Sequence, residues 1–207
     1  MSRHQVPRPP PFSKPEVHLK IVTIGNTFCG KTCLLTAFVQ GTMPKAYIPT
    51  TFDVHTANMM LDGKHVELIL PGTAHYGSFA SYRPESYSKP HVVLICFEIG
   101  EAPGCLAGLK GWIREAHEFA RGLPIILVGC KQDLRDSPKG GNLISEVEWL
   151  NDWFLQAEAV AGEIGASRYL ECSARTGKGV LEVFEVAARV ALMPKQTGWW
   201  RRIPGLR

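Results

Sequence analysis

Residues 19–32, LKIVTIGNTFCGKT, decide the fold of this chain. They open with an apolar run of strand length, Leu19–Ile24, and continue into GNTFCGKT, which fits the pattern G-x-x-x-x-G-K-[ST]. The residues that follow, Thr32–Gln40, are expected to form a helix. A strand that leads through such a loop into a helix points backbone N–H groups at phosphates, and the helix N-terminus adds positive potential. The stretch therefore predicts a phosphate-binding loop.

Two side chains of this loop carry specific expectations. Lys31 would neutralise the β- and γ-phosphates of a nucleotide, and the Thr32 hydroxyl would ligate Mg²⁺. The alternative is a chance loop on an α/β protein, which the flanking strand and helix disfavour. The predicted phosphate contacts are Gly25, Thr27, Phe28, Cys29, Gly30, Lys31, Thr32 and Cys33.

Apolar runs of strand length alternate with helical periodicity along the rest of the chain. Further strands are expected at Phe52–Met60, His65–Leu70, Val92–Glu98, Ile125–Gly129 and Tyr169–Cys172, and further helices at Trp112–Arg121, Phe154–Ile164 and Val180–Leu192. The second and third strands are joined by LDGK, residues 61–64, in which Asp-Gly is a strong hairpin signal. The predicted fold class is α/β with three layers: a six-stranded, mostly parallel sheet with helices on both faces and one antiparallel edge.

The composition fits one globular domain between two tails. The 207 residues are 45% apolar, and much of the net charge of +4 lies at the ends. Residues 1–16 are basic and proline-rich and are expected to be disordered, as a passive tail or a polyproline ligand. Residues 17–193 form the expected domain, and residues 194–207 form a basic, aromatic tail. Basic tails on a near-neutral body predict no nucleic-acid partner.

The cysteines and the apolar runs indicate the compartment. None of the six cysteines forms a paired C-x-x-C spacing, which favours free thiols in a reducing environment over disulfides or a zinc site. No apolar run approaches the roughly 20 residues that cross a bilayer, and no signal-peptide core is present. We therefore expect a cytoplasmic protein or one at the cytosolic face of a membrane.

Two later segments indicate which nucleotide is bound. CKQD, residues 130–133, follows the fifth predicted strand and so lies at the carboxyl edge of the sheet, where ligands bind. The Asp133 carboxylate can accept from guanine N1 and N2 together, and the stem of Lys131 can lie across the base. ECSAR, residues 171–175, ends the sixth strand at the same edge, where a backbone N–H can meet guanine O6. The predicted base contacts are Lys131, Asp133, Leu134, Ser173, Ala174 and Arg175.

Five segments together resemble the Ras superfamily and, within it, the Rho family. They are FCGKTCLL (28–35), YIPTTF (47–52), RPESY (83–87), IILVGCKQDL (125–134) and YLECSA (169–174). The resemblance covers about residues 17–193 and implies a P-loop small-GTPase fold that binds GTP or GDP with Mg²⁺. It also implies a monomer, exchange factors as partners, and an extra helix within Ile144–Trp153. Effectors would bind through Tyr47, Pro49, Thr50 and Phe52, and Thr50 would also ligate Mg²⁺ in the GTP state.

The chain departs from the family pattern in its second switch. The family reads Asp-Thr-Ala-Gly-Gln, whereas this chain reads GTAHY at residues 72–76. Gly72 replaces a carboxylate that anchors the Mg²⁺ shell, and His75 replaces a glycine whose N–H meets the γ-phosphate. Tyr76 replaces the glutamine that orients the attacking water, so no residue is confidently assigned as catalytic. Because phosphoryl transfer depends on positioning and electrostatics, we expect GTP hydrolysis to be strongly impaired.

A further departure lies in the phosphate loop. Thr27 occupies a position where the family usually has glycine and where a side chain crowds the incoming arginine finger. Such a finger supplies about 10³–10⁵-fold in rate. Together these departures fit selection for a stalled switch, relaxed selection, or an error in the gene model.

Two other departures concern the ribose and the membrane. Met43 stands where the family often has an aromatic residue near the ribose, which weakens base contact slightly or has no effect. The C-terminal residues WWRRIPGLR, 199–207, contain no C-a-a-X cysteine, so we expect no prenyl anchor. Tryptophans beside arginines suit weak association with an anionic membrane surface, and a solvated tail is equally compatible.

Three functions remain open on the sequence. The first is a Rho-like switch that binds GTP with Mg²⁺, engages effectors and hydrolyses GTP weakly or not at all. The second is a pseudo-GTPase, an interaction module that has lost nucleotide dependence; the intact Lys31, Thr32, Asp133 and Ser173 argue against it. The third is a slowly cycling GTPase. A P-loop kinase is disfavoured by the guanine-reading segments.

Overall fold

The computed structural model describes residues 14–44, 54–72, 88–99, 104–134 and 155–193. Its strands are β1 (Val17–Gly25), β2 (Val54–Leu61), β3 (Lys64–Pro71), β4 (Val92–Glu98), β5 (Ile125–Cys130) and β6 (Arg168–Glu171). Its helices are α1 (Lys31–Gln40), α3 (Gly104–Phe119), a helix over residues 155–163, and α5 (Val180–Leu192), with a short 3-10 helix at Gln132–Leu134.

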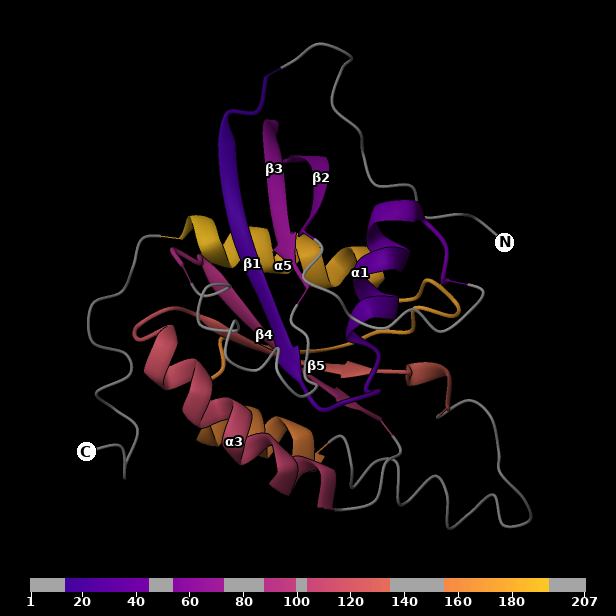
Figure 1. The fold of residues 1–207 in the computed structure, drawn as a ribbon, viewed down its shortest axis with the longest axis vertical. Coiled ribbons are helices and arrows are strands. Elements are labelled where there is room, and N and C mark those ends of the chain that lie inside the picture. Colours follow the sequence, from indigo (N-terminus) through magenta and orange to yellow (C-terminus); the bar gives the residue numbers. More distant parts are fainter. Residues whose placement is uncertain (1–13, 45–53, 73–87, 100–103, 135–154, 194–207) are drawn as a thin grey trace.

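The strands form one sheet in the order β2-β3-β1-β4-β5-β6 (Figure 1). Among the described strands, β2 and β3 pair antiparallel and each of the other neighbouring pairs is parallel. β1 lies between β3 and β4. The strands that follow it are added first on one side, as β2 and β3, and then on the other, as β4, β5 and β6, so the strand order reverses at β1. Ligands of open parallel sheets bind at such a switch point, and the predicted phosphate loop leaves β1 there. The predicted α/β fold is confirmed.

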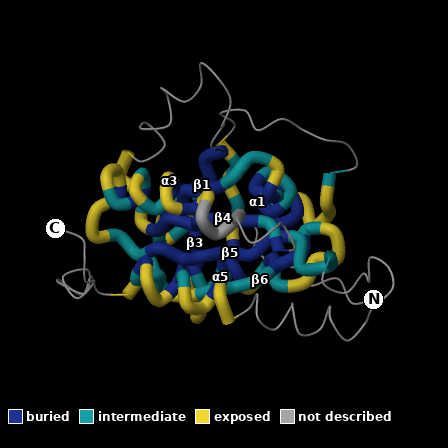
Figure 2. Tube along the Cα trace, turned by 90° about the horizontal axis from the view of Figure 1, so that it is seen from below, coloured by how far each residue is buried: buried dark blue, intermediate teal, exposed yellow. Residues whose placement is uncertain are grey.

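Helices cover both faces of the sheet and bury two separate apolar cores. One core joins α1 and α5 to the sheet, and the other joins α3 and the helix over residues 155–163. Side chains of β1 point alternately to the two faces of the sheet, so Ile21 belongs to the first core whereas Val22 and Ile24 belong to the second. Figure 2 shows the buried strands running between helices whose outer sides are exposed.

The predicted hairpin turn is confirmed between β2 and β3. Leu61 pairs with Lys64 at the end of the ladder, and the two residues between them have left-handed φ angles of 48° at Asp62 and 82° at Gly63. Positive φ at both central positions is the backbone of a type I′ turn, whose twist matches that of the strands. Phe52, the expected start of β2, lies outside the described residues.

The prediction for α3 was wrong at both ends. The expected helix was Trp112–Arg121, whereas α3 begins at Gly104 and ends at Phe119. Glycines in its first half lower the intrinsic helix propensity, but Leu109, Trp112 and Ala116 are buried against the sheet. That i, i+3, i+7 spacing gives the helix an apolar stripe, so tertiary packing outweighs propensity.

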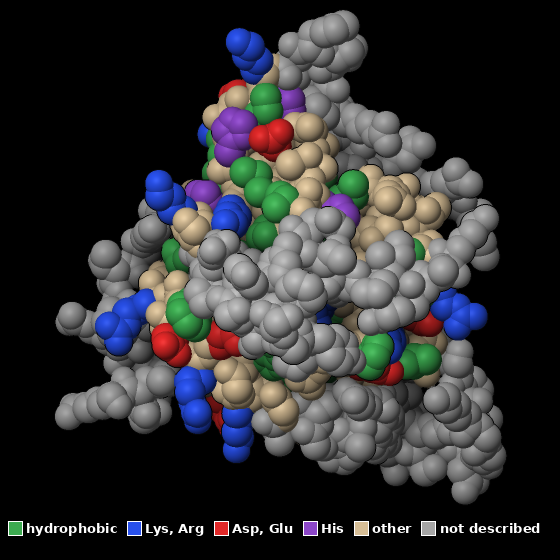
Figure 3. Space-filling model, viewed as in Figure 1, with side chains coloured by type: hydrophobic (Ala, Val, Ile, Leu, Met, Phe, Trp, Pro, Cys, Tyr) green, Lys and Arg blue, Asp and Glu red, His purple; other side chains and the backbone are tan. Residues whose placement is uncertain are grey.

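The other expected elements agree closely with the structure. α5 has the predicted bounds, and β6 begins and ends one residue earlier than expected. None of the helices in the described ranges is long and apolar enough to span a membrane. On the face shown in Figure 3, acidic and basic side chains are interspersed. The proposed insert helix within Ile144–Trp153 and most of the two tails lie outside the described residues.

Candidate nucleotide-binding site

The phosphate loop passes too close to its neighbours for side chains at two of its glycines. Gly25 ends β1 with φ +138°, and a Cβ built there would lie 2.0 Å from the carbonyl oxygen of Cys96 on β4. Gly30 has φ +109°, and its Cβ would lie 3.3 Å from the Cβ of Cys130 on β5. The loop therefore lies directly over the carboxyl ends of β4 and β5, and only glycine fits its first position.

The start of α1 has the features of an anion site. Gly30 caps the helix without any side-chain hydrogen bond, and the first turn contains no acidic residue. The amide groups and the positive end of the helix dipole are therefore not neutralised by a carboxylate of that turn. A tight glycine loop that leads into such a helix end fits a nucleotide phosphate.

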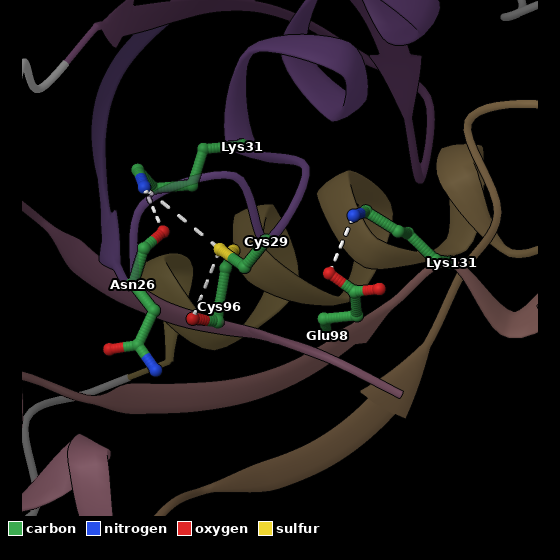
Figure 4. Close-up of polar contacts among 6 residues, drawn as sticks. All are labelled: Asn26, Cys29, Lys31, Cys96, Glu98 and Lys131. Carbon is green, nitrogen blue, oxygen red and sulfur yellow. Dashed lines mark hydrogen bonds and ion pairs between the residues drawn. The ribbon is translucent and has the colours of Figure 1, made fainter. Parts of the chain in front are cut away.

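Lys31 folds back over the loop that precedes it. Its side chain is only 6% exposed, and its ammonium donates to the carbonyl oxygens of Gly25 at 2.9 Å and Asn26 at 2.6 Å (Figure 4). The same ammonium lies 3.9 Å from the Cys29 sulfur. Main-chain carbonyls thus offset part of the cost of burying this charge. The arrangement places a positive charge inside the curve of the loop.

The loop has two features that the sequence did not predict, one contact with α3 and one unusual backbone angle. The Trp112 indole N–H on α3 donates to Asn26 Oδ1 at 2.9 Å, so the loop is tied to a helix 86 residues away along the chain. Phe28 has a left-handed φ of 62° and is 61% exposed. Bulky residues seldom adopt this conformation, and such strain gathers at functional sites. Neither feature has a local sequence signal, because each depends on the path of the loop.

The two predicted base-reading segments meet in the structure. Ser173 is almost fully buried, and its hydroxyl donates to Asp133 Oδ1 at 2.6 Å. Arg175 Nη1 lies 3.7 Å from the second oxygen of the same carboxylate. The backbone N–H of Gln132 donates to the carbonyl of Cys172 at 3.0 Å and so joins the two segments. The Asp133 side chain remains 15% exposed at the edge of the sheet.

Lys131, in the predicted base-reading segment 130–133, lies beside the phosphate loop. Its φ is 61°, its Cγ lies 3.9 Å from the Cβ position of Gly30, and its ammonium lies 2.5 Å from Glu98 Oε2 (Figure 4). Sequence reasoning missed Glu98. The available signal was a single acidic residue at the end of an otherwise apolar strand, VVLICFE, at the edge where ligands bind.

Thiols fill the space beneath the loop. The side chains of Cys29, Cys96, Cys130 and Cys172 are buried in the same apolar core, and the Cys29 thiol donates to the Cys96 carbonyl at 3.4 Å. Burial raises the pKa of the Cys29 thiol to about 12, so it is protonated at neutral pH. Burial also raises the pKa of the half-buried Cys33 thiol. These cysteines are free, and we interpret the buried ones as packing groups.

The predicted metal site is only partly within the described residues. Thr32 lies in the first turn of α1, next to Lys31, and its hydroxyl would ligate Mg²⁺. Gly72 follows β3 and supplies no side-chain oxygen. Within the described ranges, no group of three His, Cys, Asp or Glu side chains could hold a metal ion.

Several predicted site residues lie outside the described residues. These are Tyr47, Pro49, Thr50 and Phe52 of the first switch and His75 and Tyr76 of the second. Leu134 and Ala174 are described and lie beside Asp133 and Ser173 in the two base-reading segments, and Leu134 N–H donates to the Lys131 carbonyl at 2.9 Å.

Comparisons with known proteins agree with this arrangement. The family model described as Ras family matches residues 20–193. The chain is 45% identical to GTP-binding protein rho5 of Schizosaccharomyces pombe over 179 residues, which are 86% of this chain and 89% of that protein. It is 44% identical to GTP-binding protein RHO1 of Candida albicans over 181 residues, 87% of this chain and 91% of that protein. A match of this extent shows that the chain belongs to the Ras family and, within it, to the Rho-type small GTPases.

Proposed function

We propose that this chain is a guanine-nucleotide-binding switch that holds GTP with Mg²⁺ and hydrolyses it weakly or not at all. The observation that carries the proposal is the meeting of the glycine loop, Lys31 and the Ser173–Asp133 pair at one edge of the sheet. Three separate stretches of sequence converge there, one with phosphate chemistry and two with base chemistry. The relatives named above are GTP-binding proteins by name, which supports the same ligand.

The phosphate half of the site binds by charge and by backbone donors. The α1 N-terminus and the loop amides would donate to the β- and γ-phosphate oxygens. The Lys31 ammonium, now held by the carbonyls of Gly25 and Asn26, has three N–H donors and can turn one or more toward the phosphates. A buried cation exchanging neutral carbonyls for an anion gains electrostatic energy in this low-dielectric position.

The base half of the site supplies specificity. Asp133 would accept from the N1 and N2 donors of guanine, and adenine offers no matching pair of donors. The Ser173 hydroxyl orients this carboxylate by donating to Oδ1. Arg175 lies near its other oxygen, and the stem of Lys131 would cover one face of the base. The backbone at Ser173 and Ala174 would meet guanine O6.

Mg²⁺ would be held by the Thr32 hydroxyl, by Thr50 and by phosphate oxygens, and when bound it neutralises charge on the β- and γ-phosphates. Gly72 offers no carboxylate to the metal shell, so metal affinity is reduced. Hydrolysis is impaired because Tyr76 does not position water as an amide does, and because Thr27 obstructs an incoming arginine. Tyr76 and Thr27 therefore keep the triphosphate state long-lived.

Effectors would bind through Tyr47, Pro49, Thr50 and Phe52 once the γ-phosphate orders the first switch. Slow hydrolysis shifts control to expression, to localisation and to exchange factors. We propose a monomer in the cytoplasm whose C-terminal segment, residues 194–207, adds weak attraction to an anionic membrane surface.

The second candidate is a pseudo-GTPase that keeps the fold without nucleotide. It is favoured by three departures from the family pattern: Gly72, where a metal-anchoring carboxylate would stand, His75 and Thr27. Because a ligand selective for the native state stabilises that state, the two candidates differ in a melting experiment. At a ligand concentration of 100 times the Kd, the stabilisation is about 2.7 kcal/mol.

The first test is to denature the freshly purified protein and identify the released nucleotide by chromatography. Predominantly GTP is the expected result. Predominantly GDP would contradict impaired hydrolysis, and single-turnover phosphate release would then give the rate. Absence of nucleotide, with no shift of the melting temperature in excess GTP and Mg²⁺, would establish the pseudo-GTPase instead.

A further inference from the structure

The contact between Glu98 and Lys131 joins two neighbouring strands at the site. Glu98 is the last residue of β4, and it pairs in register with Cys130, the last residue of β5. Lys131 follows immediately, and its ammonium lies 2.5 Å from Glu98 Oε2. Both residues therefore lie at the ends of paired parallel strands, and the pairing of the strands positions their backbones independently of the side-chain contact.

Backbone contacts hold both ends of this ion pair. The N–H of Ile99 donates to the carbonyl of Cys130 at 2.9 Å, which extends the ladder past Glu98. The N–H of Leu134 donates to the carbonyl of Lys131 at 2.9 Å and closes the turn that follows. Lys131 itself is held at a left-handed φ of 61°. The side chain of Lys131 therefore leaves a backbone held by these contacts and ends at a carboxylate whose own backbone is part of the sheet.

The stem of Lys131 runs along the phosphate loop on its way to Glu98. Its Cγ lies 3.9 Å from the Cβ position of Gly30, and the Cβ of Cys130 lies 3.3 Å from the same point. The ammonium is therefore drawn toward β4, and the methylene groups remain beside the loop as an apolar surface. Figure 4 shows the Lys131–Glu98 pair next to the loop, apart from the contacts of Lys31.

We propose that Glu98 is a positioning residue, which fixes the stem of Lys131 as one wall of the base pocket before nucleotide arrives. This inference rests on the proposed guanine-nucleotide site. A free lysine side chain loses rotamer entropy when it is ordered against a ligand, and Glu98 removes that loss from the binding step. The pair is partly exposed, with 36% of the Lys131 side chain and 22% of the Glu98 side chain accessible, so salt weakens it.

A positioning role for Glu98 predicts a different result from two alternative roles, which are repulsion of the phosphates and a purely structural ion pair. The base and ribose are common to GDP and GTP, so loss of Glu98 lowers affinity for both nucleotides by the same factor. A carboxylate that acted only by its charge near the phosphates would repel them, and its removal would strengthen GTP binding more than GDP binding. A purely structural ion pair would change the melting temperature and leave nucleotide dissociation unchanged.

The experiment compares dissociation of fluorescently labelled GDP and GTP from the full-length chain and from Glu98→Gln, which keeps the shape and removes the charge. We expect dissociation from the variant to be about threefold to tenfold faster for both nucleotides. The difference from the unmodified chain should shrink as NaCl rises from about 0.1 M to 1 M, where the Debye length falls to about 3 Å. Asp62→Asn is the matched control, because it removes the charge from the partly exposed ion pair between Asp62 on the hairpin and Arg189 on α5 and should leave dissociation unchanged.

A double-mutant cycle tests whether Glu98 acts through Lys131. Lys131→Met keeps an apolar stem without the ammonium, and the double variant Glu98→Gln/Lys131→Met should dissociate nucleotide no faster than Lys131→Met alone. Additive effects would overturn the proposal, as would unchanged dissociation from Glu98→Gln or a selective gain of GTP affinity. If the unmodified chain cannot be loaded with labelled GDP or GTP, the proposed function fails and this inference falls with it. Normal loading with unchanged Glu98→Gln dissociation overturns the inference alone.

Discussion

The β2–β3 hairpin and the nucleotide edge of the sheet both contain left-handed backbone, but for different reasons. In the hairpin, the positive φ angles fall on Asp62 and Gly63, residue types that adopt this conformation at little cost. At the nucleotide edge they fall on Phe28 and Lys131, for which the conformation is unfavourable. The hairpin follows local turn chemistry, whereas the edge departs from it where ligand contacts are proposed. The two regions therefore differ in how well the residue type suits the backbone. Lys89, with φ 54° just before β4, shows that a lysine is also held in this conformation away from the nucleotide edge.

The largest expected effect is a loss of stability when a methyl group is added to a glycine at the nucleotide edge; the same change in the hairpin is the control. Gly25→Ala places a Cβ 2.0 Å from the Cys96 carbonyl oxygen at φ +138°, so β1 and β4 must separate. We expect a loss of roughly 4 kcal/mol or more in the free energy of unfolding, measured by urea denaturation. Gly63→Ala is the matched control, because its φ is +82° and nothing lies within 4 Å of the added Cβ. It should cost about 1 kcal/mol, and equal losses in the two variants would contradict the close approach at β4.

The next effect concerns ligand affinity. Asp133→Ala removes the carboxylate that Ser173 orients and that would accept two guanine N–H groups. We expect the Kd for GDP to rise by roughly 100-fold or more, since each hydrogen bond to a charged group contributes about 1.5–3 kcal/mol. Titration of labelled GDP measures this change. Asp62→Ala, on the hairpin, should leave the Kd for GDP unchanged. A small effect of Asp133→Ala on this Kd would mean that the guanine base does not bind at Asp133.

A smaller effect is expected where the phosphate loop is tied to α3. Asn26→Ala removes the acceptor of the Trp112 indole N–H, a part-buried contact of 2.9 Å. We expect a loss of about 1–3 kcal/mol in unfolding free energy, measured by chemical denaturation. Asn26→Asp keeps an acceptor oxygen and should recover most of it. Equal destabilisation by both variants would show that the Asn26 amide nitrogen, which lies 3.2 Å from the Cβ position of Gly108, matters more.

The same contrast explains how much the sequence could predict. Hydrophobic periodicity and Asp-Gly chemistry predicted α5, the hairpin and the sheet, because those elements obey rules read over a few neighbouring residues. Asp133 and Ser173 were predicted together because parallel strands deliver their carboxyl ends to one edge. Glu98 was not predicted, because its place at the end of an apolar strand indicates the site edge but its contact with Lys131 depends on the register of β4 and β5.

The phosphate loop shows the other limit of sequence reasoning. The spacing of its glycines predicted the loop, yet the Asn26–Trp112 contact depends on where α3 packs. The first half of α3 was itself missed, because glycines weaken its helical signal and burial restores it. Long-range packing thus decides the details that local propensity leaves open.

The smallest expected effect tests the strain directly. Phe28→Gly removes a bulky residue from a left-handed conformation that costs about 1–2 kcal/mol, but adds entropy to the unfolded chain worth about 0.5–1 kcal/mol. We therefore expect the free energy of unfolding to rise by about 0.5–1 kcal/mol, measured by urea denaturation. Asp62→Gly at the hairpin should change it by less, because aspartate tolerates this conformation. If Phe28 is retained for the ligand, Phe28→Gly should also speed GDP dissociation while it stabilises the fold. A destabilised Phe28→Gly would instead mean that ring packing outweighs strain, and the contrast between the two regions would then rest on Lys131 alone.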